Sequence, residues 1–262
     1  MPYPLAYIER LGYKILEGIE GLGHFTSFMT KVFYWTTKKP FRTKLLMDQI
    51  HFIGNKSLFI VCLTAIFSGM VMAYQIYFGF QIMSGDALVG PIVALSMAKE
   101  IAPVFTGLVV SGRCAAAMAA QIGTMKVTEQ LDALEVMGIS SYQYLAVPRI
   151  IGATLALPLL SMIFLFVANC GSYYVGTVLL GIDEVLYFSK LHLFVFIEDI
   201  YQCFIKSFFF GFLIGSIGSY HGFSVHGGAE GVGKGTNLAV VWSMVIVLIV
   251  DYFLTSFLVQ VL

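Results

Sequence analysis

The sequence carries very little charge, because Asp, Glu, Lys and Arg make up only 11% of its 262 residues. Soluble domains have about 25%. Apolar residues reach 58% and aromatic residues 15%, and this mixture has too few polar side chains to cover a surface in water. A soluble globular enzyme is therefore excluded. The 15 basic residues are balanced by 15 acidic ones, so nucleic acid is not an expected partner.

The chain also lacks the patterns that hold disulfides, metals or catalytic groups. Its cysteines stand far apart without a CxxC pair, which favours buried apolar thiols at Cys62, Cys114, Cys170 and Cys203. The five histidines have no ligand spacing, and GxSxG and HExxH are absent. We therefore expect no catalytic residue, no metal and no cofactor.

One glycine-rich segment, residues 227–235, comes close to a phosphate-binding loop. Gly228 to Lys234 has the GxxxxGK spacing, but Gly235 stands where a hydroxyl would hold Mg²⁺. No strand of an α/β sheet precedes it. We interpret the segment as a cytoplasmic turn.

Long charge-poor runs predict an all-α polytopic membrane protein. Each run exceeds the roughly 20 residues that cross a hydrocarbon core. Five transmembrane helices are expected near residues 57–83, 101–123, 150–176, 206–222 and 237–259. The apolar run 87–98 is either a re-entrant helix or the start of the second span. The third run, if wholly helical, projects beyond the bilayer or breaks at Pro158 or Gly171.

Positive charge is unevenly distributed between the two sides of this five-span arrangement. Eight Lys and Arg precede the first span, and the same side has Lys126, Arg149 and Lys234. The other side has only Lys99, Lys190 and Lys206. The positive-inside rule predicts a cytoplasmic N-terminus and a periplasmic C-terminus in a bacterial-type inner membrane.

Residues 1–56 form a separate N-terminal segment before the transmembrane domain, residues 57–262. On a helical wheel its apolar residues gather on one face: Leu5, Ile8, Leu11, Ile15, Leu16, Ile19 and Leu22. This pattern predicts an amphipathic helix lying in the membrane interface. A helix packed on a soluble domain is the alternative.

Three charges fall in or at the expected spans. Arg113 lies within the second span, Asp251 within the last, and Glu100 opens the second. Inserting such a charge into the bilayer core costs about 2.5–3.5 kcal/mol of free energy. Each of these side chains therefore needs a partner on another helix or in the substrate. For Arg113 and Asp251, an interhelical salt bridge or polar clamp explains the charge as well as a functional role does.

A stripe of small residues also runs along the second span at intervals of four, formed by Gly107, Ser111, Ala115, Ala119 and Gly123. Such a stripe lets two helix backbones approach closely. We expect it to serve packing.

Residues 127–137 predict a short amphipathic helix between the second and third spans. Glu129, Asp132 and Glu135 recur every three residues, while another face carries Val127, Leu131 and Leu134. Gly138 suits the C-terminal stop. The helix is either a solvated connection or a docking helix for a cytoplasmic partner.

Four segments together resemble the MlaE/YrbE-type permeases, the membrane subunits of ABC transporters that work with MCE-domain proteins on lipids. They are FSGMVMAYQ (67–75), KEIAPVFTGLVVSGR (99–113), IGTMKVTEQLDALEVMG (122–138) and GGAEGVGKGTNLAVV (227–241). Their order and spacing match over nearly the whole chain. Two positions depart from the family pattern: Lys234 stands where Arg is common, and Gly235 where Ala is common, which we expect to loosen the start of the last helix.

The resemblance implies a homodimer that encloses a lipid cavity, and a separate cytoplasmic ATPase subunit, which can carry a STAS-domain protein. An MCE-domain protein is implied on the outer face, with phospholipid as the usual cargo. The ATPase-coupling residues implied by the EQLDAL stretch are Glu129, Gln130, Leu131, Asp132, Ala133 and Leu134.

Candidate lipid contacts combine apolar length with a polar entrance. Met70, Tyr74 and Tyr77 share one face of the first span, although such a stripe also suits plain helix packing. Glu100 is expected near the headgroup, with Lys206 offsetting it or attracting a phosphate. A self-contained secondary transporter or channel is the alternative function, and a lipid-modifying membrane enzyme is a third.

Overall fold

The computed structural model describes residues 4–80 and 86–261. Its side chains are described at residue 16 and from residue 18 onward, apart from those at 81–86, 259, 261 and 262. These ranges contain helices and connections and no strand. The expected all-α architecture is therefore confirmed.

Five continuous helical stretches are long and apolar enough to cross a membrane: Thr43–Phe80, Val89–Val127, Tyr142–Leu179, Ile197–Phe223 and Gly228–Leu258. The first is α2 (Thr43–Phe80). The second joins α3 (Val89–Ser96), η3 (Met97–Ile101), α4 (Ala102–Val110), η4 (Ser111–Ala115) and α5 (Ala116–Val127). The third joins η5 (Tyr142–Ala146), α7 (Val147–Tyr173) and η6 (Tyr174–Leu179); the last two are α9 (Ile197–Phe223) and α10 (Gly228–Val261).

These helices are longer than the runs without charge. The second begins at Val89, so residues 89–98 belong to the start of a long helix and do not form a re-entrant one. The third passes through Pro158 and Gly171 without a break, so this helix is longer than a bilayer core requires. The helix that contains the first span begins before the expected boundary at residue 56, because α2 runs from Thr43 to Phe80. The connection between the N-terminal helix and α2 lies at residues 37–42.

Glycine allows the closest helix contacts. A Cβ at Gly69 of α2 would lie 1.9 Å from the Ala168 carbonyl oxygen of α7, and one at Gly211 of α9 would lie 2.5 Å from the Ala153 oxygen. Any larger residue would push these backbones apart. The α2–α7–α9 packing therefore depends on these glycines.

The small-residue stripe of the second span packs as expected. On α9, a Cβ at Gly218 would lie 3.0 Å from Cα of Ala115, and one at Gly222 would lie 3.2 Å from Cα of Ala119. At Gly107 the neighbours are Val247 of α10 and Phe210 of α9. The stripe therefore brings α4 and α5 against the last two helices.

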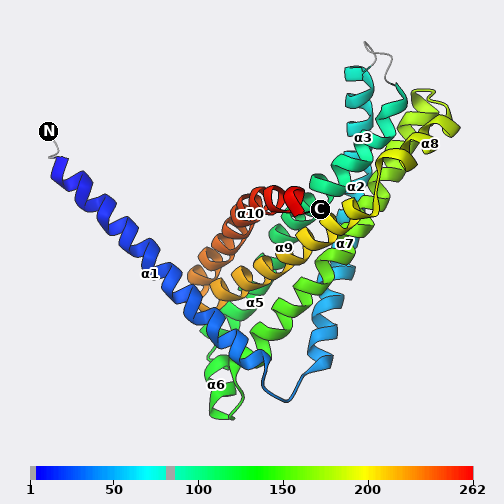
Figure 1. Cartoon of the computed structure of the whole chain (residues 1–262). Helices are drawn as coiled ribbons and strands as arrows, with labels where there is room; N and C mark the ends of the chain where they lie inside the picture. Colours follow the sequence, from blue (N-terminus) through cyan, green and yellow to red (C-terminus); the bar gives the residue numbers. More distant parts are fainter. Residues whose placement is uncertain (1–3, 81–85, 262) are drawn as a thin grey trace.

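The N-terminal helix α1 (Pro4–Thr36) projects from the bundle (Figure 1). Its C-terminal half packs on the bundle through a cluster that contains Phe28, Val32 and Val147. Farther toward the N-terminus, Leu16, Ile19 and Leu22 are exposed; the wheel positions before Leu16 lie outside the described side chains. An exposed apolar row suits a helix in the membrane interface.

Two short helices lie at opposite ends of the bundle (Figure 1). The first, α6 (Gln130–Val136), shares its end with the α1–α2 connection. The second, α8 (Glu184–Phe194), was not expected from the sequence. It is anchored by the buried Tyr187, whose hydroxyl lies 3.1 Å from Ser172 Oγ and whose ring lies against Gly90.

The glycine-rich segment is a helix rather than a turn for most of its length. Gly227 and Gly228 have positive φ angles and make the turn, after which α10 begins. Lys234 forms an exposed ion pair with Glu230, 2.7 Å away. Gly235 is buried, and a Cβ there would lie 2.8 Å from Val225 Cγ2. Glycine at this position therefore permits close packing instead of loosening the helix.

The expectation of four buried thiols is only half right. Cys114 and Cys203 are buried, Cys62 is partly buried, and Cys170 is exposed. Cys170 lies on α7, within a helix apolar enough to face lipid.

Candidate functional site

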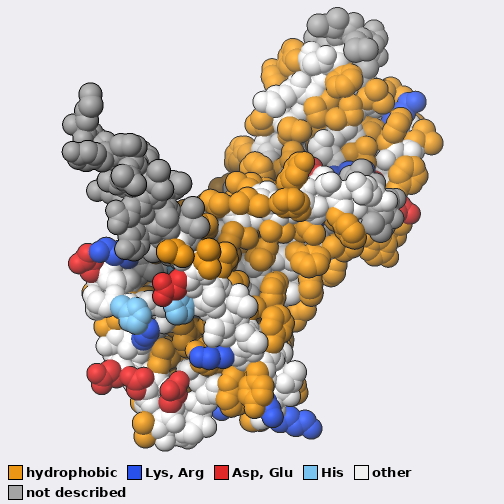
Figure 2. Space-filling model, turned by 60° about the vertical axis from the view of Figure 1, so that its left-hand side comes forward, with side chains coloured by type: hydrophobic (Ala, Val, Ile, Leu, Met, Phe, Trp, Pro, Cys, Tyr) orange, Lys and Arg blue, Asp and Glu red, His pale blue; other side chains and the backbone are white. Residues whose placement is uncertain are grey.

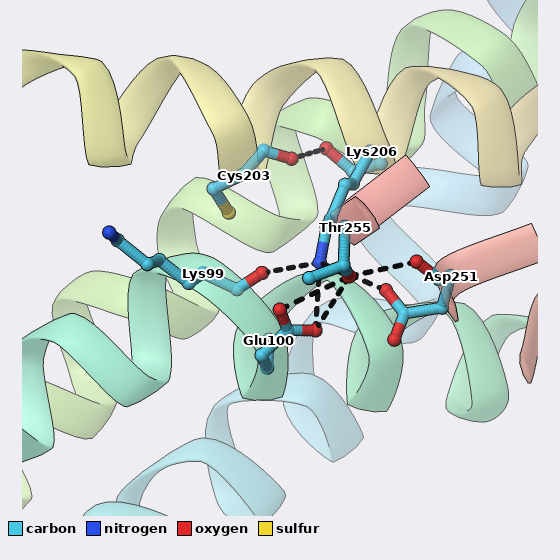
Figure 3. A network of polar contacts seen from close by, with 7 residues as sticks. Lys99, Glu100, Cys203, Lys206, Asp251 and Thr255 are labelled. Carbon is cyan, nitrogen blue, oxygen red and sulfur yellow. Dashed lines mark hydrogen bonds and ion pairs between the residues drawn. The ribbon is translucent and has the colours of Figure 1, made fainter. Parts of the chain in front are cut away.

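A buried ammonium group connects three of the long helices. Lys206 of α9 donates hydrogen bonds to Glu100 Oε2, Thr255 Oγ1 and the Lys99 carbonyl, each at 2.7 Å (Figure 3). Its side chain has no exposed surface. Asp251 of α10 completes the cluster, with its Oδ1 3.1 Å from Lys206 Nζ.

The local sequence explains why this ammonium group fits. Pro103 has no N–H, so the Lys99 carbonyl, four residues earlier, lacks its usual α-helical donor, and Lys206 supplies one. Since an ammonium group has three protons, these three bonds use all of them. Asp251 is then held by charge alone, and its Oδ1 is buried without a hydrogen bond.

A second ion pair lies beside the first. Lys99 Nζ is 3.1 Å from Asp199 Oδ1, and Asp199 also accepts from the Phe196 N–H at the start of α9. Two cations thus face three carboxylates. Glu100 is the most exposed of the three carboxylates, with 41% of its side chain exposed, and Lys99 is the exposed cation, at 40%. The cluster can receive a donor or cation at Glu100, while Lys206 is already enclosed.

The structure places the expected polar residues deeper than their predicted positions. Lys206 does not begin its helix, since α9 starts at Ile197, and Glu100 lies well inside the second helix. The partners that Glu100 and Asp251 need are on other helices and include Lys206. Thr255 and Lys99 were not predicted as part of this site, because their contacts with Lys206 form only where three helices meet.

Arg113 has a different kind of partner. It donates to Ser57 Oγ and, at 3.3 Å, to the Phe52 carbonyl on α2, and its guanidinium lies 5.2 Å from the Phe52 ring centroid. This is a polar clamp between helices rather than a salt bridge. Arg113 lies in η4 and Glu100 in η3, both π-helical turns. Such turns often mark functional positions.

The three residues expected to share one face of the first span, Met70, Tyr74 and Tyr77, do not all line the same pocket. Met70 and Tyr74 line a shallow pocket of about 340 Å³ with Val71, Gln75 and Val175. Tyr74 is 51% exposed, whereas Tyr77 is partly buried and packs against the hydrophobic core. Met70 also packs against that core, but it shares the pocket with Tyr74. Within the described residues, no hydrogen bond or ion pair links this pocket to the Lys206 cluster.

A larger apolar groove, of about 520 Å³, lies beneath α8 and was not predicted. Its walls come from α3, α7, α8 and α9, and include Phe166, Asn169, Tyr173 and Leu191. Asn169 Oδ1 is buried and lacks a hydrogen-bond partner. No sequence pattern indicated this groove, because it depends on how α8 folds back onto the bundle.

The short helix α6 differs in detail from the expected helix 127–137. Val127 ends α5, and Glu129 lies in the turn before α6 with a left-handed φ of 59°. At the other end, Gly138 has a positive φ and closes the helix, with the Ile139 N–H donating to the Leu134 carbonyl at 2.9 Å.

The exposed surface around α6 carries both acidic and apolar side chains. Glu129 and Asp132 are exposed. Of the predicted apolar face, Leu131 is buried, Leu134 is partly buried and Val127 is exposed. The sequence missed two apolar residues at its tip, Val136 and Met137, which are 89% and 65% exposed. Figure 2 shows charged side chains gathered toward this lower end of the molecule, whereas the visible upper part is mainly apolar.

These features define the class: a multi-pass helical membrane protein with paired charges inside its helices and a short amphipathic helix at one end. In the residues described, no group of three or more His, Cys, Asp or Glu side chains is placed to hold a metal ion. The family model described as Permease MlaE matches residues 46–257. The chain belongs to this permease family, as its four sequence segments suggested.

Relatives from distant organisms support the same assignment. A probable ABC transporter permease of Rickettsia typhi is 36% identical over 251 residues, covering 96% of this chain and 97% of its own. The Haemophilus influenzae intermembrane phospholipid transport system permease protein MlaE is 33% identical, covering 95% and 96%. The chloroplastic protein trigalactosyldiacylglycerol 1 of Arabidopsis thaliana is 37% identical, covering 82% and 61%. The chain is thus a permease of the ABC transporter type.

Proposed function

We propose that this chain is the inner-membrane subunit of an ABC transporter that moves phospholipid or another lipid to or from an MCE-domain partner. The observation that carries the proposal is family membership over most of the chain. Two relatives have names that refer to phospholipid transport or to a galactolipid. The apolar pockets on the membrane-facing helices suit the same class of cargo.

A separate ATPase subunit supplies the energy in this proposal, and α6 is its docking element. Its exposed acids and apolar tip form a compact surface of the kind that a groove on a partner accepts. Glu129, Gln130, Asp132 and Ala133 are exposed and make the contact, together with the partly buried Leu134. Leu131 anchors α6 to the bundle instead of facing the partner.

The cargo is proposed to contact two surfaces of the permease. Met70 and Tyr74 offer apolar length with one hydroxyl, which suits acyl chains and the glycerol region. Tyr77 supports that wall from within. Glu100, the exposed carboxylate, faces the headgroup. Lys206 holds Glu100 in place instead of binding the cargo, because all three protons of the Lys206 ammonium group are already donated within the protein.

Photo-crosslinking tests these cargo contacts. We expect lipid adducts from crosslinking residues at positions 74 and 100, with a weaker yield at position 77, where the side chain is partly buried. The control is position 119, because Ala119 packs against Gly222 and should capture protein. Adduct masses from purified protein distinguish the two results. Lipid at position 119 and none at the other three would contradict the cargo assignment.

The proposed complex contains two copies of this chain, with a cytoplasmic N-terminus and a periplasmic C-terminus. An open pocket at Tyr74 suits a cavity wall that a second copy closes. The lower end, which carries α6 and the α1–α2 connection, shows Lys and Arg side chains as well as Asp and Glu (Figure 2), and its Lys and Arg suit the cytoplasmic side under the positive-inside rule. A STAS-domain protein bound to the ATPase and an MCE-domain protein at the α8 end complete the assembly.

Purification from native membranes tests the function as a whole. A tagged chain is expected to bring down an ATPase subunit together with retained lipid, both visible by native mass spectrometry. A secondary transporter or channel, or a lipid-modifying enzyme, would retain no ATPase under the same conditions. Purification of the chain alone, with its transport intact, would overturn the proposal.

A further inference from the structure

The connection between α1 and α2 is strongly positive. No acidic residue occurs between Glu20 and Asp48, whereas Lys38, Lys39, Arg42 and Lys44 fall within seven residues. In the part of the chain that the structure describes, the ion pairs involve none of these four side chains. A cluster of unpaired cations next to a membrane helix attracts anionic lipid headgroups.

A cavity of about 180 Å³ lies between this connection and the start of α7. Its polar wall includes Lys38, Arg42 and Gln143. Its apolar wall is formed by Trp35, Phe41, Leu46, Val147, Pro148 and Ile151. The cavity is thus lined by two cations together with apolar side chains, and none of its lining residues is acidic.

Arg42 is the residue of this polar wall that lacks a hydrogen-bond acceptor for one of its buried N–H groups. Its guanidinium lies 4.9 Å from the Tyr144 ring centroid, while its Nε is buried without a hydrogen bond. Gln143 donates to the carbonyl of Lys38 at 2.8 Å, which fixes the connection against η5. Because a guanidinium can only donate, an anionic oxygen in the cavity would satisfy it.

We propose that this cavity binds the phosphodiester headgroup of an anionic phospholipid, with the phosphate at Lys38 and Arg42. The apolar wall favours a lipid over a soluble anion, since it would contact the first part of the acyl chains. The exposed Leu16, Ile19 and Leu22 of α1 also suit a helix at the lipid surface. Whole ligands usually need about 300–1,000 Å³, so only part of the lipid enters and the rest stays in the bilayer.

This lipid is distinct from the cargo. The α1–α2 connection lies at the end of the bundle opposite α3 and α8 (Figure 1), whereas Glu100 lies in η3, directly after α3. The cavity also contacts η5, which follows α6 in the chain. The binding itself depends neither on the identity of the cargo nor on the presence of an ATPase.

Native mass spectrometry of the permease released from nanodiscs tests the site. The nanodiscs contain phosphatidylglycerol and phosphatidylcholine in equal amounts, and the wild type is expected to retain phosphatidylglycerol selectively. Lys38→Gln with Arg42→Gln should reduce that selectivity at least about tenfold, since each cation contributes to binding. The matched control, Lys39→Gln with Lys44→Gln, removes the same charge from the same segment outside the cavity and should lose far less.

The proposal would be overturned by no selectivity in the wild type, by equal losses in the two double variants, or by release of the lipid by excess inorganic phosphate. The second result would show a diffuse surface attraction, and the third a site for free phosphate. Thermal unfolding in lipid-free detergent checks that each variant folds. If the cavity double variant does not fold, Arg42→Lys replaces it, because it keeps the charge but loses the planar group; unchanged selectivity in a folded Arg42→Lys would also contradict the site.

Discussion

Replacing Lys206 with Met is expected to destabilise the folded permease by about 3–5 kcal/mol, because it leaves two carboxylates near each other without their cation. Glu100 and Asp251 lie 2.7 and 3.1 Å from the lost ammonium group. Thermal unfolding of the purified protein in one fixed detergent measures the loss. Transport should fail in the same variant, since the polar contact that α9 shares with α10 and the second helix is lost.

The chain contains its own control for this experiment. Lys234 and Glu230 also lie 2.7 Å apart, but their side chains are 73% and 79% exposed. Lys234→Met should therefore cost no more than about 1 kcal/mol. Removing all three charges of the Lys206 contact, with Glu100→Gln and Asp251→Asn added to Lys206→Met, should recover much of the stability. A Lys206→Met protein as stable as the Lys234→Met protein would show that the cluster is not what joins these helices.

Reversing two charges on α6 is expected to release the proposed ATPase while leaving the membrane helices folded. Glu129→Lys with Asp132→Lys changes only exposed side chains, so the melting temperature should hardly move. Affinity for the ATPase should fall at least about thirtyfold, because central charges of an interface carry about 2 kcal/mol or more. Co-purification and ATP-dependent lipid transfer measure the two losses.

A matched double variant separates docking from general charge. Glu20→Lys with Glu230→Lys reverses two exposed acids that lie outside α6 and should leave assembly intact. Val136→Ser with Met137→Ser tests the apolar tip and should also weaken assembly. Survival of both assembly and transport in the Glu129, Asp132 variant would show that the ATPase docks elsewhere.

Much of the architecture could be predicted from local patterns. Five apolar runs predicted five long helices, because a run of about 20 apolar residues has few stable alternatives to a membrane helix. The stripe from Gly107 to Gly123 predicted a close helix contact, and α4 and α5 do pack there against α9 and α10. The family assignment also followed from sequence segments alone, and the Permease MlaE match agrees with it.

Helix ends were less predictable, since charged residues were taken as boundaries. Lys99, Glu100 and Lys206 lie inside long helices, where they are tolerated because they pair with one another and with Asp199 and Asp251. No local pattern shows that pairing. Its partners are more than 40 residues apart in the chain, and only the meeting of the helices identifies them.

The sequence by itself determined what this protein is made of: five membrane helices, an amphipathic N-terminal helix, a short helix near residue 130 and membership of a permease family. Only the tertiary structure decided which charges neutralise each other, that Val136 and Met137 lie at an exposed tip, and where α8 closes a groove. The physical reason is the range of the interactions. Apolar length and helical period act within one segment, whereas the pairing of Lys206 and the cavity beside Arg42 require segments that meet only after folding.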